Sequence, residues 1–270
     1  MELSPAQASV IKKLKGDRNV DDLSVHPTAT LAAMDARYSF SSTRVVLAAL
    51  KKMYPACKEF AAESKKRREQ YKKLDESQEP TDKQREKFVA WADVLAFRDE
   101  YRSQMSQAEY FLMCLYTMWA PVRADYTPME VVTRKPRTLK DGTNYLIVRP
   151  KSIDCLFHAY KTHEVYGDQL RKMPKALEAV TRQWLDTHAG DAYLFQDEAG
   201  NPWQPQRLGA TLRRVFQRFH GMDTGISTLR HSYATHLYKG MPALKELKRL
   251  SSAMMHSVTQ AQAYRHIELE

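Results

Sequence analysis

STLRHSYATHL, residues 227–237, is the stretch from which the organisation of this chain is best worked out. It opens a helix that we expect over residues 228–239, and it places Arg230 near the start of that helix. A lone arginine in a helix is most often a salt-bridge or packing residue. The stretch therefore indicates chemistry only if other parts of the chain supply matching groups.

Two earlier stretches carry such groups. WAPVRADYTPME follows a strongly apolar segment, which we expect to be a buried helix, and places Arg123 just beyond its end. HAYKTHEVYGDQ places Lys161 directly after an expected strand, at the start of a turn. Each residue alone is a weak signal, because exposed cations are common on any surface.

The last stretch, MMHSVTQAQAY, supplies His256 and Tyr264. A tyrosine this near a chain terminus contributes little to packing. It is therefore either an ordinary apolar anchor or a group that is there to react, and only the other candidates can decide between the two.

Composition narrows the class of protein. The chain of 270 residues carries 42 Lys and Arg against 32 Asp and Glu, a net charge of +10, and it is 43% hydrophobic. A globular chain this basic favours a polyanionic partner, with nucleic acid first and an anionic membrane surface second. Three widely spaced cysteines, no apolar run long enough to span a membrane and no signal-peptide pattern predict an intracellular protein.

The chain divides into two expected domains, residues 1–80 and 81–270. The first reads as helical, with an apolar stripe over 41–54 and a charged helix that contains SKKRREQYKK (64–73), a phosphate-contacting or simply solvated face. The polar segment 75–84 reads as a linker. Capping boxes open one helix at Thr81–Gln84 and another at Ser106–Glu109.

The second domain is predicted to be a helical body with a small antiparallel β-sheet, so the fold class is mainly α with a minor β component. Two strands are expected at 145–148 and 155–160, joined by a turn at 150–152, and GDQLRKMP (167–174) is a candidate third strand. Four helical segments follow: KALEAVTRQWLDTH, PQRLGATLRRVFQRFH, TLRHSYATHLYK and PALKELKRLSSAM.

Several enzyme classes lack support. The nine glycines are scattered, with no phosphate-binding loop, and neither an HExxH nor a CxxC motif occurs. We therefore expect no nucleotide cofactor and no catalytic metal.

In their order along the chain and in the sequence around them, these candidate residues resemble the catalytic domain of tyrosine recombinases, the phage-type integrases. That family uses Arg, a hairpin Lys, a His-x-x-Arg motif, a His or Trp and a Tyr. Arg123, Lys161, Arg230, His256 and Tyr264 match this series, over about residues 90–267. LYTMWAPVRADY and YKTHEVYG resemble integrases of virophages, Maverick-type elements and large DNA viruses.

Two positions depart from the family pattern. Ser227 stands where the family usually has the first His of His-x-x-Arg, and a serine cannot shuttle a proton near neutral pH. The spacing from His256 to Tyr264 is also one residue shorter than in many bacterial relatives, which we interpret as a subfamily feature.

The residue types suit DNA strand cleavage without metal or ATP. A tyrosine oxygen that attacks phosphorus conserves the bond energy as a phosphotyrosine. Arg123 and Arg230 would stabilise charge on the phosphate, Lys161 would protonate the leaving 5′ oxygen, and His256 would hydrogen-bond the phosphate or the nucleophile.

The resemblance implies an integrase or recombinase of a mobile element or virus, acting on double-stranded DNA as a tetramer. It would lie with DNA in a prokaryotic cytoplasm, or in a host nucleus or viral factory. Three alternatives remain open: a type IB topoisomerase, a weakly catalytic or architectural DNA-binding relative, and a helical scaffold for membrane surfaces or proteins.

Overall fold

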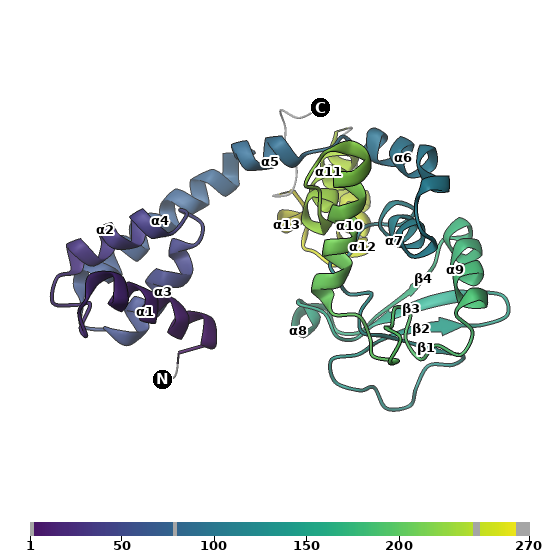
Figure 1. The fold of residues 1–270 in the computed structure, drawn as a ribbon, viewed down its shortest axis with the longest axis horizontal. Coiled ribbons are helices and arrows are strands. Elements are labelled where there is room, and N and C mark those ends of the chain that lie inside the picture. The colour runs from purple at the N-terminus through teal and green to yellow at the C-terminus, as the bar shows by residue number, and fades with distance from the viewer. Residues whose placement is uncertain (1–2, 78–79, 240–243, 263–270) are drawn as a thin grey trace. The chain divides into compact units, whose positions relative to one another are not determined.

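The computed structural model describes residues 3–77, 80–239 and 244–262 (Figure 1). The chain forms two compact units, Met1–Ser77 and Gln78–Glu270. Tyr264 lies outside the described residues. Among the described helices, none is both long and apolar enough to cross a membrane.

The first unit is built from helices packed around a small apolar core. The core includes Leu14, Met34, Leu50 and Phe60, all with no exposed surface. Burial of these side chains is what holds so short a helical unit together, since isolated helices are marginal in water. The helices are α1 (Pro5–Arg18), α2 (Pro27–Arg37), α3 (Thr43–Met53) and α4 (Lys58–Ser77).

The apolar helix face predicted over residues 41–54 is buried in its middle, as expected, but not at its C-terminal end. Val46, Leu47 and Leu50 on α3 are buried, as expected. Met53 is 39% exposed, because it lies on the last turn, where the helix leaves the core. Tyr54 follows the helix, and its hydroxyl accepts a hydrogen bond from the Leu23 amide at 3.3 Å.

Arg67, within the charged run 64–73 on α4, is turned into the unit. Its side chain is 10% exposed. It donates hydrogen bonds to Glu63, Asp35 and Thr43 at 2.7–3.0 Å. This arginine links three helices, so the run is only partly a solvated face.

The second unit is a helical body with one small sheet. Both predicted capping boxes are present, at Thr81–Gln84 and Ser106–Glu109, and each begins its helix at the expected residue. The helices are α5 (Asp82–Lys87), α6 (Trp91–Glu100), the short 3₁₀ helix η1 (Arg102–Gln104), α7 (Gln107–Thr117), α8 (His163–Tyr166), α9 (Lys175–Thr187), α10 (Pro205–His220), α11 (Ile226–Tyr238), α12 (Leu244–Ala253) and α13 (Val258–Gln262).

The sheet is mixed, and the expectation of a wholly antiparallel sheet is wrong in one pairing. Strands lie in the order β1 (Met129–Val132), β2 (Asn144–Val148), β3 (Ile153–Phe157) and β4 (Gln169–Lys172). The β2–β3 and β3–β4 pairs are antiparallel, but β1 is parallel to β2. The reason is the segment 133–143, which carries the chain back so that Asn144 starts beside Met129.

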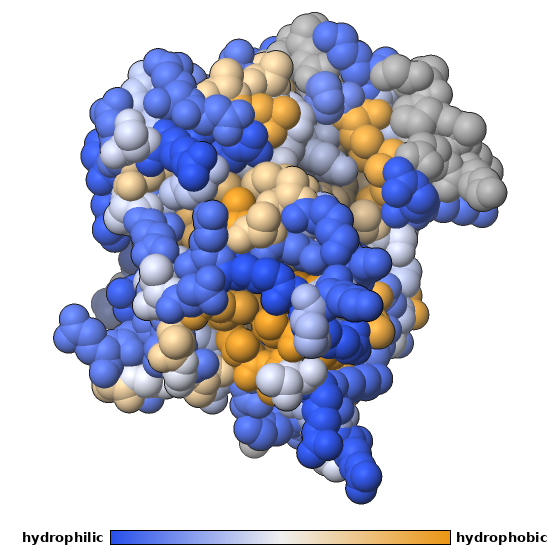
Figure 2. Space-filling view, turned by 90° about the vertical axis from the view of Figure 1, so that its right-hand side faces the viewer, coloured by the Kyte–Doolittle hydropathy of each residue, from blue (hydrophilic) through white to orange (hydrophobic). Residues whose placement is uncertain are grey.

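Helix α7 is the centre of the core. Its residues from Phe111 to Tyr116 have almost no exposed surface, and Phe111 stacks on Trp184 of α9 with ring centroids 4.9 Å apart. Buried apolar surface of this extent is the main stabilising term of the unit. On the face in Figure 2, hydrophilic residues predominate and hydrophobic areas are smaller. The predicted fold class, mainly α with a small sheet, is confirmed.

Candidate functional site

The loop after α7 holds Arg123 in a defined position. The Tyr116 hydroxyl donates a hydrogen bond to the Arg123 carbonyl at 2.7 Å, and the Arg123 amide donates to the Asp125 carboxylate at 3.2 Å. The Asn144 side chain in turn donates to the Asp125 carbonyl at 2.7 Å. Helix α7 and strand β2 therefore fix this loop from two sides.

Arg230 lies near the N-terminal end of α11, as the sequence predicts, and is only 3% exposed. A buried cation at this end of a helix is disfavoured by the helix dipole and by desolvation. An anion beside it would relieve both costs. Ser227, three residues earlier on the same helix, is exposed.

His256 is buried, with 3% of its surface exposed. It follows Met255, whose φ of 54° is in the left-handed region, and its amide donates to the Ser251 carbonyl at 3.0 Å. The left-handed residue and this hydrogen bond form a turn just after the end of α12. Charges from three other parts of the chain act on this imidazole.

Burial lowers the pKa of His256 to about 3, with further lowering by the charges of Arg230, Arg123 and Lys161. The effect of a charge on the pKa of another group weakens as the distance between them grows. The charges of Arg123, Lys161 and Arg230, which are far apart in the sequence, therefore all reach the region around His256. The fifth candidate, Tyr264, lies outside the described residues.

Lys161 lies on an exposed loop between β3 and β4, not directly after a strand. Strand β3 ends at Phe157, three residues earlier than expected. The ladder stops there because the amides of His158 and Ala159 donate to the Asn144 side-chain oxygen, both at 2.8 Å. Thr162 ties the loop to the His256 turn, since its hydroxyl donates to the Met255 carbonyl at 3.2 Å.

Two charged residues that the sequence analysis missed lie in the same region. Burial raises the pKa of Asp125, while the positive charges of Arg123, Arg230 and Arg171 oppose the rise. Arg171 on β4 donates to the carbonyls of Ser252 and Ala253 at the end of α12. Its position in a short strand gave no sequence signal for this contact, which depends on how α12 packs against the sheet.

A pocket of about 240 Å³ opens beside His256. Arg171 and Lys248 contribute positive charge to its wall, and Ser251 and Ser257 contribute hydroxyl groups. Cationic and hydroxyl groups together favour an anionic ligand, such as a phosphate group. The whole lining consists of Tyr160, Tyr166, Gln169, Arg171, Lys248, Ser251, Ser252, Met255, His256, Ser257 and Val258.

Part of the chain is similar to a known recombinase. Over 76 residues the chain is 40% identical to the tyrosine recombinase XerD of Corynebacterium glutamicum. This likeness supports the tyrosine recombinase family. The alignment covers 27% of this chain and 24% of that recombinase, and no family model matches the sequence.

Two solved structures of recombinases are similar in part. The first is that of XerA recombinase, with a TM-score of 0.49 and 14% identity over 97% of this chain and 86% of that chain. The second is the XerH site-specific recombinase bound to its difH substrate. It has a TM-score of 0.48 and 17% identity over 68% of this chain and 51% of that chain.

The lowered pKa of His256 predicts how the stability of the protein changes with pH. Because its pKa falls from 6.5 to about 3 on folding, the unfolded chain binds more protons between these values. The free energy of unfolding should therefore decrease as pH falls from about 6.5 towards 3. Chemical denaturation at several pH values measures this, and the His256→Gln variant should show a weaker dependence. An equal dependence in both proteins would contradict a neutral, buried His256.

Proposed function

We propose that the protein is a site-specific DNA recombinase that cleaves and rejoins strands through a 3′-phosphotyrosine, without metal or ATP. The proposal is carried by Arg230, which is buried near the start of α11, together with Arg123 and Lys161, since the charges of all three lower the pKa of the buried His256. The segment likeness to a tyrosine recombinase supports the same class of reaction.

In the proposed reaction each side chain has a separate task. Arg123 and Arg230 stabilise the negative charge that builds up on the attacked phosphate, since planar guanidinium groups match its oxygens. Lys161, on an exposed loop, protonates the leaving 5′ oxygen. His256, uncharged near neutral pH, exchanges hydrogen bonds with the phosphate or the nucleophile. Tyr264 is the nucleophile.

Strand exchange follows from the chemistry of the intermediate. Attack by Tyr264 forms a bond between its phenolic oxygen and phosphorus and releases a 5′ hydroxyl. The 5′ hydroxyl of a partner strand then attacks the phosphotyrosine and releases the tyrosine, so no bond is lost to hydrolysis. We propose a DNA-binding role for residues 1–80, catalysis by residues 81–270, and a tetramer on paired DNA sites.

The decisive experiment is covalent trapping on a nicked duplex that loses its short 5′ fragment after cleavage. The full chain is incubated with duplexes containing candidate sites, in the presence of EDTA, and the products are separated under denaturing conditions. A protein–DNA adduct that survives denaturation supports the proposal. If the chain binds the duplex but forms no covalent adduct, the result would favour the architectural alternative instead.

Duplex binding should depend steeply on salt. The net charge of +10 and a phosphate-directed site predict that backbone contacts supply most of the affinity. If about six or more phosphates are contacted, the affinity should fall by about 1000-fold between 50 and 200 mM salt. Fluorescence anisotropy with a labelled duplex measures this. Salt-independent or absent binding would point to the scaffold alternative.

Ser227 keeps a second candidate function open, that of a weakly catalytic or architectural DNA-binding protein. It is exposed near the start of α11, so a larger side chain fits there without displacing the core. If a proton shuttle is lacking, Ser227→His should raise single-turnover cleavage by up to about 100-fold. Rapid-quench kinetics on the nicked duplex measures the rate. A large loss would mean that the serine hydroxyl has its own role.

Strand relaxation distinguishes the remaining alternative. A type IB topoisomerase uses the same covalent step but rotates one strand about the other and needs no partner site. Relaxation of supercoiled plasmids lacking paired sites would therefore favour that activity over recombination.

A further inference from the structure

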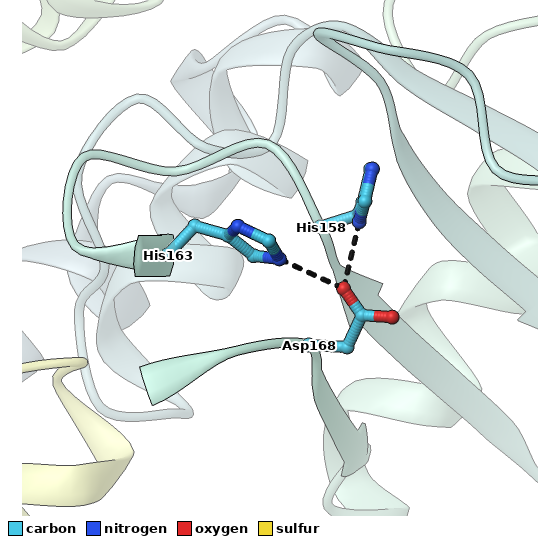
Figure 3. Close-up of side chains that lie close together, drawn as sticks. All are labelled: His158, His163 and Asp168. Carbon is cyan, nitrogen blue, oxygen red and sulfur yellow. Dashed lines mark hydrogen bonds and ion pairs between the residues drawn. The ribbon is translucent and has the colours of Figure 1, made fainter. Parts of the chain in front are cut away.

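The loop that carries Lys161 also carries a cluster of two histidines and a carboxylate. His158 directly follows β3, His163 begins α8, and Asp168 directly precedes β4. Nδ1 of His158 lies 2.7 Å from Oδ1 of Asp168, and Nε2 of His163 lies 3.0 Å from the same oxygen. Figure 3 shows both rings directed at this carboxylate.

The three side chains match the donor set of a transition-metal site. Their donor atoms all lie within 4.8 Å of one another. A tetrahedral ion with bonds of about 2.0–2.1 Å holds its donors about 3.3 Å apart. Small rotations of the partly exposed Asp168 carboxylate and the two rings would bring the donors to that spacing.

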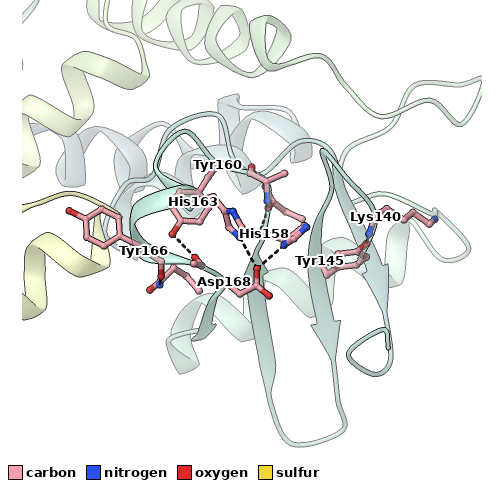
Figure 4. A network of polar contacts seen from close by, with 11 residues as sticks. Lys140, Tyr145, His158, Tyr160, His163, Tyr166 and Asp168 are labelled. Atoms are coloured by element: carbon pink, nitrogen blue, oxygen red, sulfur yellow. Dashed lines mark hydrogen bonds and ion pairs between the residues drawn. The ribbon is translucent and has the colours of Figure 1, made fainter. Parts of the chain in front are cut away.

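The backbone around the cluster is held independently of the three side chains. Asn144 accepts hydrogen bonds from the amides of His158 and Ala159, which fixes one end of the loop. The Tyr160 hydroxyl donates to the Gly167 carbonyl at 2.7 Å, which fixes the other (Figure 4). Gly167 has a φ of 62°, a conformation that brings Asp168 back towards the histidines.

The chemistry favours Zn²⁺ among common divalent ions. Two neutral imidazole nitrogens and one carboxylate suit borderline ions such as zinc, whereas Mg²⁺ and Ca²⁺ prefer oxygen ligands throughout. The side chains of His158 and His163 are 22% and 36% exposed, so an ion can reach them and water can complete its coordination.

We propose that His158, His163 and Asp168 form a binding site for a divalent transition-metal ion, best fitted by Zn²⁺. The ion would join the two ends of the loop to α8 and so restrict the motion of Lys161, which lies between the first two ligands in the sequence. Its role is to position the loop and not to take part in the reaction. The proposal does not depend on the proposed recombinase activity.

Isothermal titration calorimetry of the full, untagged chain with ZnCl₂ tests the site. We expect one Zn²⁺ per chain, no comparable heat with MgCl₂, and binding at least about tenfold weaker in both His163→Gln and Asp168→Asn. His26→Gln is the matched control, because His26 is also exposed but lies in the other unit. Circular dichroism establishes that each variant is folded.

Absence of Zn²⁺ binding by the native chain would overturn the site, and the cluster would then be a hydrogen-bonded clasp only. Unchanged binding by both variants would overturn it equally. Hydrogen exchange tests the effect on the loop: Zn²⁺ should slow exchange of amides in 159–167 in the native chain and not in His163→Gln. Binding without this slowing would refute the restriction of Lys161.

Discussion

The Tyr264→Phe variant is expected to form no covalent adduct with the nicked duplex, while its affinity for the duplex stays within about twofold of the native value. The substitution removes only the phenolic oxygen, which is the atom that would bond to phosphorus. Arginine and lysine stabilise charge and transfer protons in the proposed reaction, so neither takes the place of the tyrosine as nucleophile. Denaturing gels and a parallel anisotropy titration measure the two quantities.

Tyr166→Phe is the matched control for this variant. Tyr166 lines the pocket beside His256, and 38% of its surface is exposed, so its hydroxyl is an alternative nucleophile among the described residues. The control should form the adduct at the native level. If the adduct persists in Tyr264→Phe and disappears in Tyr166→Phe, the nucleophile is Tyr166 on α8. Peptide mapping of the adduct identifies the modified tyrosine directly.

The Arg230→Ala variant is expected to lower single-turnover cleavage by about 100- to 1000-fold at saturating protein. This is the loss that follows removal of one preorganised donor to a developing oxyanion. Arg230 is suited to that task, since it is buried near the start of α11 and its charge acts on both His256 and Asp125. Duplex affinity should change little, because one phosphate contact among many is lost.

Two further variants separate the chemistry of Arg230 from its effect on folding. Arg230→Lys keeps the charge but lacks the planar fork, so its cleavage rate should lie between those of the native protein and Arg230→Ala. Arg134→Ala removes an exposed arginine from the segment after β1 and should leave cleavage intact. Thermal melting establishes that each variant is folded. Near-native cleavage by folded Arg230→Ala would show that the site is misassigned.

Features that depend on neighbouring residues were predictable from the sequence. The capping boxes at Thr81 and Ser106 begin their helices as expected, because the hydrogen bonds involved span only three residues. Helix α10 has the predicted bounds, Pro205–His220, since proline at its start and glycine after its end act locally. The mainly helical fold class followed from such segments.

Features that depend on distant partners were not predictable. The end of β3 is set by the side chain of Asn144, which takes the amides that would have extended the strand. The parallel pairing of β1 depends on the path of residues 133–143 and has no periodic signal. The same holds for Arg171, whose contacts with the carbonyls after α12 exist only once that helix is packed.

By itself, the sequence determined the helical class, the basic charge and the residue types suited to phosphate chemistry, because these depend on composition and short-range periodicity. Only the tertiary structure decided that Arg123, Lys161 and Arg230 act on one buried imidazole. That convergence requires long-range hydrogen bonds, such as the one from the Thr162 hydroxyl to the carbonyl of Met255. Such contacts form between segments far apart in the chain, and their free energy appears only when the core has assembled.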